Sequence, residues 1–329
     1  WNTSLTSIVV FQADGEGASP HEFGQRVLGP IANRYGLEPL QPDHSAVTVS
    51  LDGFQCHVKS IETKTGNILI VTVSRSSDHF EGWRGELSHY QGRIRSLLQF
   101  LPSDPSAIFS VFKVSASDLK EALTILQQYS AHVAERPMGV GIIWGCLLAV
   151  FDDRHQGDSG QVVERDLLLS PLSLASQETE ATTSELLEGI AFLASIQGEV
   201  HRLHRMRQPF FAQIGSTEED ARKAIGQVLL RRYGGTVKLE DLETSLEEIT
   251  TRFSTMSVLA GTVRRDCITV EDRLDAVEGL LRRWNESEVE GYPTIFSMEM
   301  ARCSALSKPF KGFLDRTEVL RGELGTVLD

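Results

Sequence analysis

An acidic stretch offers the clearest candidate chemistry in this sequence. In FDDRHQGDSG, at 151–160, Asp152, Asp153 and Asp158 stand close together beside His155. Carboxylate oxygens are the ligands that Mg²⁺ and Ca²⁺ prefer, so these three aspartates are candidate ligands for Mg²⁺ or another divalent cation. The same residue types also form turns, and a solvated hairpin loop after a strand is the commoner use of such a stretch.

Two histidines form a second candidate. His201 and His204 are spaced i, i+3 on a predicted helix, so both can point the same way. With Glu199 or an external carboxylate they could bind Zn²⁺. However, Arg202 and Arg205 lie beside them, and positive charge opposes a cation site. A surface helical face is the simpler interpretation, and a site for an anion or an acidic partner is the alternative.

Two further motifs have structural explanations. ADGEGASPHE, at 13–22, lies between a predicted strand and a predicted helix, where phosphate loops occur. Yet Ser19 and Glu22 fit a capping box with Pro20 at the first helical position, and the stretch lacks GxxxxGK[ST]. Cys56 and His57 are adjacent on a predicted strand, so their side chains point to opposite faces and cannot form a direct catalytic pair.

No catalytic signature replaces these candidates. The sequence contains no nucleophile elbow, no HExxH and no Rossmann fingerprint. We therefore expect a protein that is not an enzyme, with no catalytic and no cofactor-binding residues to assign.

Composition narrows the class of protein. The chain has 329 residues, a net charge of -13, 41% hydrophobic residues and 23% charged residues, which is ordinary for a globular protein. The negative charge argues against nucleic acid as a partner, since that would need a basic stripe. The longest apolar run, 140–151, is too short to span a bilayer, which takes roughly 20 residues. The scattered cysteines predict buried free thiols rather than disulfides.

The first half alternates between strand and helix signals. It predicts a helix within 13–36, whose apolar face runs from Phe23 to Tyr35, and helices over 83–101 and 116–135. Strands are predicted over 4–12, 45–51, 54–61, 67–74, 106–115, 139–151 and 161–170. A mixture of hairpins and crossovers favours a mixed β-sheet with packed helices, so the expected fold class is α+β.

The second half is helical. Helices are predicted over 184–214 and 217–235, followed by the strongest periodicity in the chain. One heptad position is occupied by Leu239, Leu246, Phe253, Ala260, Cys267, Leu274 and Leu281, and the other by Leu242, Ile249, Met256, Val263, Val270, Val277 and Trp284. Every slot is apolar, which predicts one coiled-coil-like helix on the order of 70 Å long.

A second seam follows a short break. NESEVEGYP, at 285–293, interrupts the first seam, and a new one runs from Phe296 to Val327, so we expect two antiparallel helices. Glu299 is a charged residue in an apolar slot, and Pro309 should kink the helix. The expected organisation is a mixed α/β domain at 1–175, connecting helices at 176–236, and a long helical hairpin at 237–329.

This order of elements resembles the cytosolic part of the CorA family of divalent-cation channels. The resemblance rests on the α/β stretch up to about residue 170, the helical stretch 238–284 and the closing FLDRTEVLRGELGTVLD, at 313–329. It is one of architecture and carries over no functional residue. In that family the last long helix continues into the first membrane span. The chain is accordingly expected to be a fragment that continues toward a membrane beyond residue 329.

The resemblance implies a function. It suggests a regulatory domain of a Mg²⁺-class transport protein, on the cytoplasmic side of the cell membrane, that assembles as a homo-oligomer and binds divalent cations at subunit interfaces. As an isolated fragment the domain is expected to be cytoplasmic. The first alternative is a soluble or membrane-anchored coiled-coil scaffold or oligomerisation module without transport or catalysis. The second is an enzyme whose site is built from scattered residues.

Overall fold

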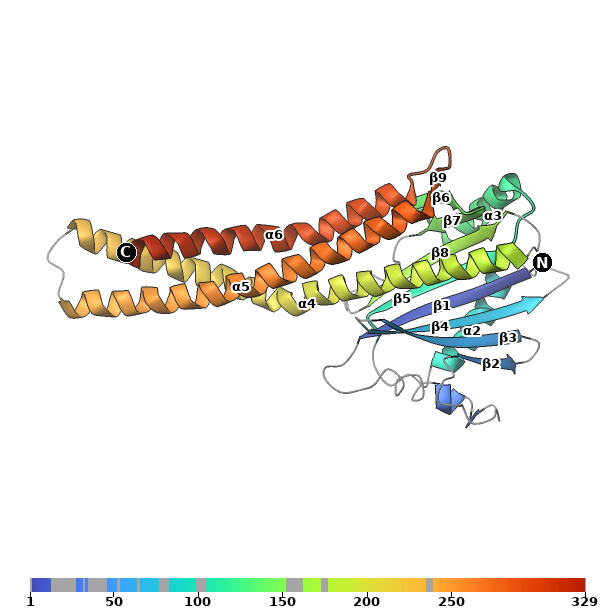
Figure 1. Ribbon diagram of the computed structural model, residues 1–329, viewed down its shortest axis with the longest axis horizontal. Coiled ribbons are helices and arrows are strands. Elements are labelled where there is room, and N and C mark those ends of the chain that lie inside the picture. The colour runs from blue at the N-terminus through green and yellow to red at the C-terminus, as the bar shows by residue number, and fades with distance from the viewer. Residues whose placement is uncertain are drawn as a thin grey trace. The chain divides into compact units, whose positions relative to one another are not determined.

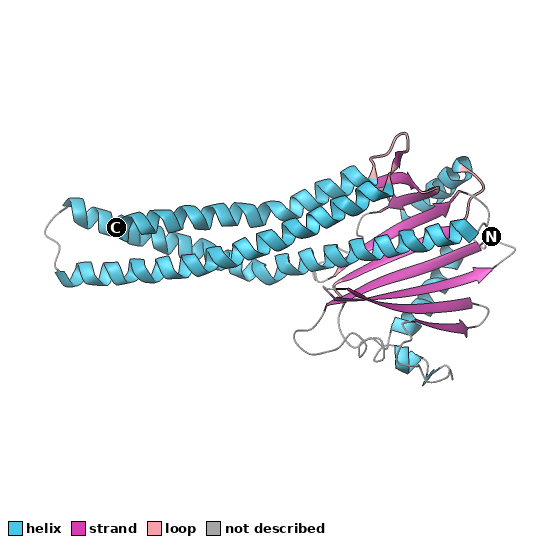
Figure 2. Cartoon of the chain, in the orientation of Figure 1, coloured by secondary structure: helices cyan, strands magenta, loops and turns pink. Residues whose placement is uncertain are grey.

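The computed structural model describes most of the chain. The described residues are 2–12, 28–31, 33–34, 46–51, 54–63, 66–76, 83–98, 105–151, 162–172, 177–234 and 239–328. They show an α+β fold, in which a mixed sheet is packed with helices and followed by long helices, as the sequence predicts. Figure 2 shows the sheet as a single layer with helices on both of its faces.

The described strands form one nine-stranded sheet in the order β2-β3-β4-β1-β5-β8-β7-β6-β9 (Figure 1). Among the described strands, the neighbours β5 and β8 are parallel, and every other neighbouring pair is antiparallel. The strands are β1 (Asn2–Gln12), β2 (Ala46–Leu51), β3 (Phe54–Thr63), β4 (Gly66–Ser76), β5 (Ala107–Val114), β6 (Gly139–Ile143), β7 (Cys146–Val150), β8 (Val163–Pro171) and β9 (Ser287–Glu288).

The central strand β1 is buried on both faces, as its position predicts. Leu5, Val9 and Phe11 alternate onto the face that packs against α2 (Trp83–Leu98) and α3 (Leu119–Val133). Because successive side chains of a strand point to opposite faces, Ile8 and Val10 are directed to the other face, and both are buried too.

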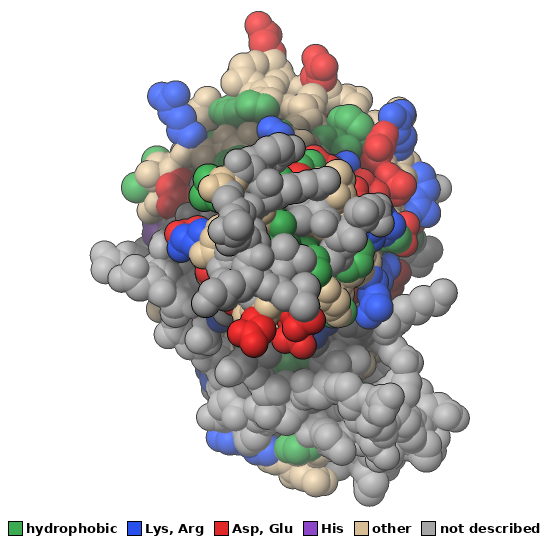
Figure 3. All heavy atoms as spheres, turned by 90° about the vertical axis from the view of Figure 1, so that its left-hand side faces the viewer, with side chains coloured by type: hydrophobic (Ala, Val, Ile, Leu, Met, Phe, Trp, Pro, Cys, Tyr) green, Lys and Arg blue, Asp and Glu red, His purple; other side chains and the backbone are tan. Residues whose placement is uncertain are grey.

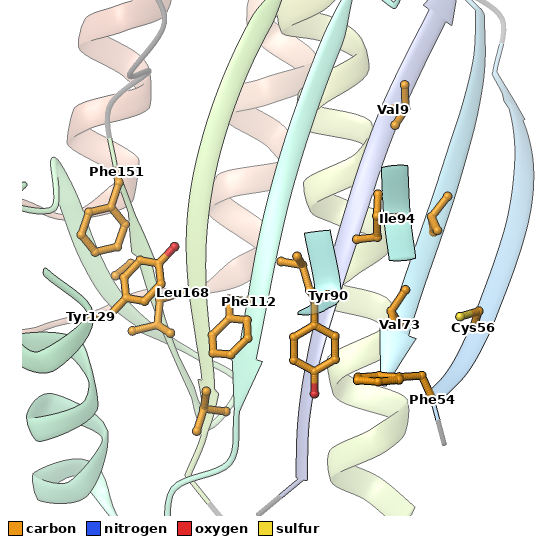
Figure 4. Packing of buried hydrophobic residues seen from close by; sticks show 14 of the residues in the cluster. Val9, Phe54, Cys56, Val73, Tyr90, Ile94, Phe112, Tyr129, Phe151 and Leu168 are labelled. Atoms are coloured by element: carbon orange, nitrogen blue, oxygen red, sulfur yellow. The ribbon is translucent and has the colours of Figure 1, made fainter. Parts of the chain in front are cut away.

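A row of aromatic rings crosses the face covered by α2 and α3 (Figure 4). Phe54 meets Tyr90 at 5.6 Å between ring centroids, Tyr90 meets Phe112 at 6.0 Å, Phe112 meets Tyr129 at 6.2 Å, and Tyr129 meets Phe151 at 5.1 Å. Rings of the helices alternate with rings of β3, of β5 and of Phe151, the residue that follows β7. Such offset and edge-on pairs add to the free energy of burial, so they tie both helices to the sheet.

The opposite face packs against long helices. Gly198 of α4 (Gln177–Gly234) lies against β5, where an added Cβ would be 3.3 Å from the Cβ of Ala107. An added Cβ at Gly139 of β6 would be 3.3 Å from the Cα of Ile295, the first residue of α6 (Ile295–Leu328). Glycine is needed at both places because the helices approach the strands so closely.

The predicted strand 139–151 is wrong as a single element. The structure divides it into β6 and β7, which pair with each other antiparallel. Trp144 and Gly145 form the turn with positive φ angles of 49° and 76°. Positive φ at both central residues is typical of a two-residue hairpin. A tryptophan is a poor turn signal, so the uniformly apolar run conceals the reversal.

The long helices follow their seams closely. α5 spans Leu239–Trp284, the bounds that the first heptad seam predicts. The two helices predicted over 184–214 and 217–235 are instead one helix, α4, of 58 residues. α6 runs from Ile295 to Leu328 and continues through Pro309.

The chain divides into two compact units. Unit 1 comprises residues 1–201 and 277–300, and unit 2 comprises residues 202–276 and 301–329. The three segments expected from the sequence are each continuous, whereas both units combine separate stretches. Each of α4, α5 and α6 contributes residues to both units.

Candidate functional site

The predicted cation ligands lie outside the described residues. Asp152, Asp153 and Asp158 belong to the stretch 152–161, between β7 and β8. The strands on either side are antiparallel neighbours, and the backbone N–H of Phe151 donates to the carbonyl of Asp166 at 2.9 Å. The motif at 13–22 also lies outside the described part of the chain.

The cysteines agree with the sequence. Cys56, Cys146, Cys267 and Cys303 are all buried and free. On β3, Cys56 is buried while its neighbour His57 is exposed, which confirms that the two side chains point to opposite faces. Burial raises the pKa of Cys56 to about 11, so this thiol resists ionisation. Partial desolvation of the ring, and then the charge of Lys59, lower the pKa of His57.

The histidines of α4 are not gathered into a metal site. Among the described residues, no group of three or more His, Cys, Asp or Glu side chains could hold a metal ion. His204 lies instead against aromatic rings, with its ring centroid 6.5 Å from that of Phe211 and 6.0 Å from that of Phe310. A solvated surface face therefore describes His204 poorly.

A buried polar cluster is the site that the sequence analysis missed. Arg165 of β8 and Glu299 of α6 form an ion pair whose side chains are 1% and 0% exposed. Gln197 of α4, itself buried, donates from Nε2 to Oε2 of Glu299 at 2.6 Å. The sheet and two helices thus each contribute one side chain.

The local sequence directs each member into the interior. Arg165 has the same orientation as Leu167 and Leu169 because alternate residues of β8 share a face. Glu299 occupies the apolar slot of the second seam that had no explanation. A charged residue in a core-facing position on both elements was the available signal, but only the fold shows that the two positions meet.

The hydrogen bonds in this cluster satisfy the carboxylate of Glu299 more fully than they satisfy the side chains of Arg165 and Gln197. Nη1 of Arg165 donates to Oε1 of Glu299, and Gln197 occupies Oε2. The guanidinium carbon of Arg165 also lies 5.5 Å from the ring centroid of Phe109, at a distance typical of a cation–π contact. Nε and Nη2 of Arg165 and Oε1 of Gln197 have no hydrogen-bond partner within the described part of the chain.

This chemistry suits anchoring rather than catalysis. Opposite charges neutralise each other, and both carboxylate oxygens are already occupied by donors. Removal of one partner would leave the other as a buried, uncompensated charge, which is far less stable than the pair. The cluster therefore holds α4 and α6 in one position on the sheet of unit 1.

The start of α6 is anchored a second time. The carboxylate of Glu286 accepts from the backbone N–H groups of Ile295, at 2.6 Å, and Phe296, at 2.8 Å. It thereby satisfies donors that a helix N-terminus leaves free. Burial nevertheless raises the pKa of Glu286, and these two hydrogen bonds oppose that rise. The strand β9 follows directly and pairs with β6 at the sheet edge.

Unit 2 carries its charged groups nearer the solvent. Glu218 of α4 accepts from Arg316 of α6 and pairs with Arg222 at 3.1 Å. Arg264 pairs with Glu318, and Glu271 pairs with Lys311 at 2.8 Å. Because residue numbers rise along α5 as they fall along α6, these pairs confirm that the two helices are antiparallel.

One face of the surface mixes the two signs of charge. Figure 3 shows acidic and basic side chains interspersed among apolar ones over the described residues that face the viewer. This view gives no sign of the basic stripe that nucleic-acid binding would require over those residues.

Comparison with known proteins leaves the family open. No protein family, curated protein or solved structure matches this chain. Within the described residues, no helix combines the length and the apolar character needed to cross a membrane.

Proposed function

We propose that this chain is the cytosolic regulatory domain of a CorA-like, Mg²⁺-class divalent-cation transport protein, and that it works as a homo-oligomer on the cytoplasmic side of the membrane. The organisation of the fold supports this proposal. An α/β sheet precedes three long helices, and each helix contributes residues to both compact units. That organisation suits a domain that detects an ion and passes the change along helices.

The anchor formed by Arg165, Glu299 and Gln197 is the observation that carries the proposal. Gln197 and Glu299 precede the last residues of unit 1 on their helices, 201 and 300, by about one turn or less. A helix held rigidly at that point must follow a displacement of the sheet, since packed elements transmit strain rather than absorb it.

The proposed cation ligands are Asp152, Asp153 and Asp158. They follow β7 and precede β8, the strand that carries Arg165. An ion bound there would act on the same strand that holds α6. In the proposed mechanism, bound Mg²⁺ favours one arrangement of subunits, and loss of the ion favours another.

Thermal unfolding and the mass of the assembly in Mg²⁺ and in a chelator test this proposal. A ligand that binds only the folded state raises the melting temperature as its concentration rises. We expect Mg²⁺ to raise the melting temperature and to change the mass, and the triple variant D152N/D153N/D158N to lose both responses. The matched control is E243Q/E247Q/E248Q, which removes the same charge from exposed positions of α5. No response of the parent chain to Mg²⁺, or equal losses in both variants, would overturn the ion-sensing function.

A scaffold or oligomerisation module is the second candidate. Two exposed apolar side chains of α5 favour it, since Val258 is 68% exposed and Ile268 is 52% exposed. Exposed apolar groups on a long helix suit contact with a partner helix. A mass above that of the monomer in chelator that falls in V258S/I268S, without any response to Mg²⁺, would favour this candidate over the transport domain.

A further inference from the structure

Two of the long helices contain a proline far from their ends. Pro209 lies within α4 (Gln177–Gly234), and Pro309 lies within α6 (Ile295–Leu328). Proline has no N–H group, so neither Pro209 nor Pro309 can donate the usual helical hydrogen bond to the carbonyl four positions earlier. In general, a proline ring inside a helix clashes with the carbonyl of the residue four positions earlier, which favours a bend. Each helix therefore has a weak point in its interior.

The two weak points lie at one level of unit 2. Phe211, two residues after Pro209, stacks on Phe313 with 4.1 Å between ring centroids and meets Phe310 edge-on at 5.6 Å. Further along, Glu218 pairs with Arg316, so residue numbers rise together and α4 and α6 run parallel. Pro209 and Pro309 are therefore near neighbours along the direction of the helices.

Glycines follow both prolines. Gly215 of α4 and Gly312 of α6 have open space where a side chain would be, since an added Cβ would meet nothing within 4 Å. Packing does not require glycine at either place. A glycine inside a helix lowers its stability because the unfolded backbone is unusually free. Each helix thus combines a proline, which lacks an N–H donor, with a flexible glycine about one to two turns later.

The third helix is different at this level. The ion pair between Glu271 and Lys311 places the middle of α5 beside the Pro309 segment of α6. From residue 262 to residue 278, α5 contains neither proline nor glycine. This stretch of α5 keeps all of its potential helical hydrogen bonds.

We propose that unit 2 contains a paired-proline bending point, at which α4 and α6 bend together while α5 remains a continuous helix. The aromatic rings of His204, Phe211, Phe310 and Phe313 form the pivot, because they hold the two weak segments against each other. Two isolated prolines would bend their helices independently, but prolines at one level direct both bends to the same place. The bending point would exist whatever ion or partner the protein serves.

Amide hydrogen exchange on the whole chain tests the bending point. We expect amides in 206–215 and 306–315 to exchange on the order of ten- to a hundredfold faster than those in 266–275 of α5. Alanine is the best helix former, so P209A/P309A should fold and should slow exchange in both segments toward the rate of α5. If all three segments already exchange at one rate, or if P209A/P309A leaves them unchanged, no bending point exists.

A matched control separates local bending from general stability. G261A/G279A adds alanine to α5 at two positions that are also open, so it improves helix propensity without touching either proline. We expect it to leave exchange in 206–215 and 306–315 unchanged. An equal slowing in this control would show that the proline segments merely report the general stability of the long helices, and it would overturn the proposal.

A distance measurement along α4 gives an independent result. Spin labels at F192C and K223C lie on exposed positions of the same helix, while the native cysteines are buried. A straight helix would separate them by about 46 Å at 1.5 Å per residue. We expect a distance distribution that is broad or shorter in the parent chain and narrows toward the straight value in P209A. A narrow distribution at the straight value in the parent chain would contradict the bend.

Discussion

Among the described residues, Glu299 in unit 1 and Glu218 in unit 2 are both largely withdrawn from solvent, but they have very different partners. In unit 1, Glu299 is 0% exposed and its partner Arg165 is 1% exposed. In unit 2, the side chain of Glu218 is 11% exposed, while Arg222 and Arg316 are 62% and 52% exposed. Water therefore still solvates the cations in unit 2, whereas in unit 1 both charges depend on each other. A glutamate–arginine ion pair is therefore a rigid anchor in unit 1 and an adjustable contact in unit 2.

The difference matches what each unit has to hold together. Unit 1 joins strands that are distant in the sequence, such as β5 and β8, and it must fix helices on them at one register. A buried ion pair leaves few alternative positions, because any shift exposes an unpaired charge to an apolar interior. Unit 2 consists of segments of α4, α5 and α6, in which local hydrogen bonds supply most of the order, so surface pairs suffice.

The largest expected effect is that of breaking the anchor. Glu299→Ala leaves Arg165 buried without a counter-ion, and we expect the free energy of unfolding to fall by about 3–5 kcal/mol. Urea unfolding, followed by hydrogen exchange in β5 and β8, measures the loss. The double variant R165M/E299L should recover much of it, because an apolar pair of similar volume needs no counter-ion. A loss below about 1 kcal/mol would show that the anchor does not hold unit 1.

Next in size is an effect of pH on the core of unit 1. Burial raises the pKa of Cys56 from 9.0 to about 11. Between these values the unfolded thiol has lost its proton and the folded thiol has kept it, so the folded state becomes less stable as pH rises. The loss between pH 9 and 11 should reach up to about 2–3 kcal/mol relative to Cys56→Ala, whose stability lacks this contribution.

Cys267 provides the comparison within unit 2. Its pKa is raised by burial first and then by the nearby carboxylates Glu271 and Asp266. Both thiols should therefore contribute to a decline in the free energy of unfolding as pH rises, measured by denaturant unfolding at a series of pH values. Cys267→Ala should remove the contribution of Cys267. Equal slopes for the parent chain and Cys56→Ala between pH 9 and 11 would contradict the buried, apolar setting of Cys56.

A smaller effect is expected for the corresponding glutamate of unit 2. Glu218→Ala removes the partner of Arg222 and Arg316, but both arginine side chains are more than half exposed and remain solvated. We expect a loss of about 1 kcal/mol or less in unit 2, measured by hydrogen exchange in α4 and α6. A loss as large as that of Glu299→Ala would remove the distinction between the two glutamates.

Local signals predict the helices of this protein better than its turns and its anchor. The heptad seam predicts α5 to the residue because an apolar stripe at helical spacing is complete in itself. The mixed sheet with packed helices is likewise confirmed. The turn at Trp144 was missed because its positive φ is supplied by the surrounding hairpin and not by a turn-forming residue type. Arg165 and Glu299 are 134 positions apart, and no local pattern can pair them.

A local effect of comparable size is expected at the second attachment of α6 in unit 1. An added Cβ at Gly141 would lie 1.9 Å from Oε1 of Glu286, so Gly141→Ala must displace the carboxylate that caps α6. Glutamate is flexible, and the expected loss is that of a helix cap, about 0.5–2 kcal/mol. Gly279→Ala is the matched control, because its Cβ would meet nothing within 4 Å. It should stabilise α5 by about 0.5–1 kcal/mol.

Hydrogen exchange at the first turn of α6 distinguishes the two attachments. If Glu286 and Glu299 act separately, Gly141→Ala should speed exchange near Ile295 and Phe296 while β8 keeps its protection. Loss of protection at Arg165 and its neighbours in the same variant would mean that the Glu286 cap and the Arg165–Glu299 ion pair are energetically coupled. The anchor of unit 1 would then extend from Glu286 to Glu299, and its rigidity would arise from both contacts together.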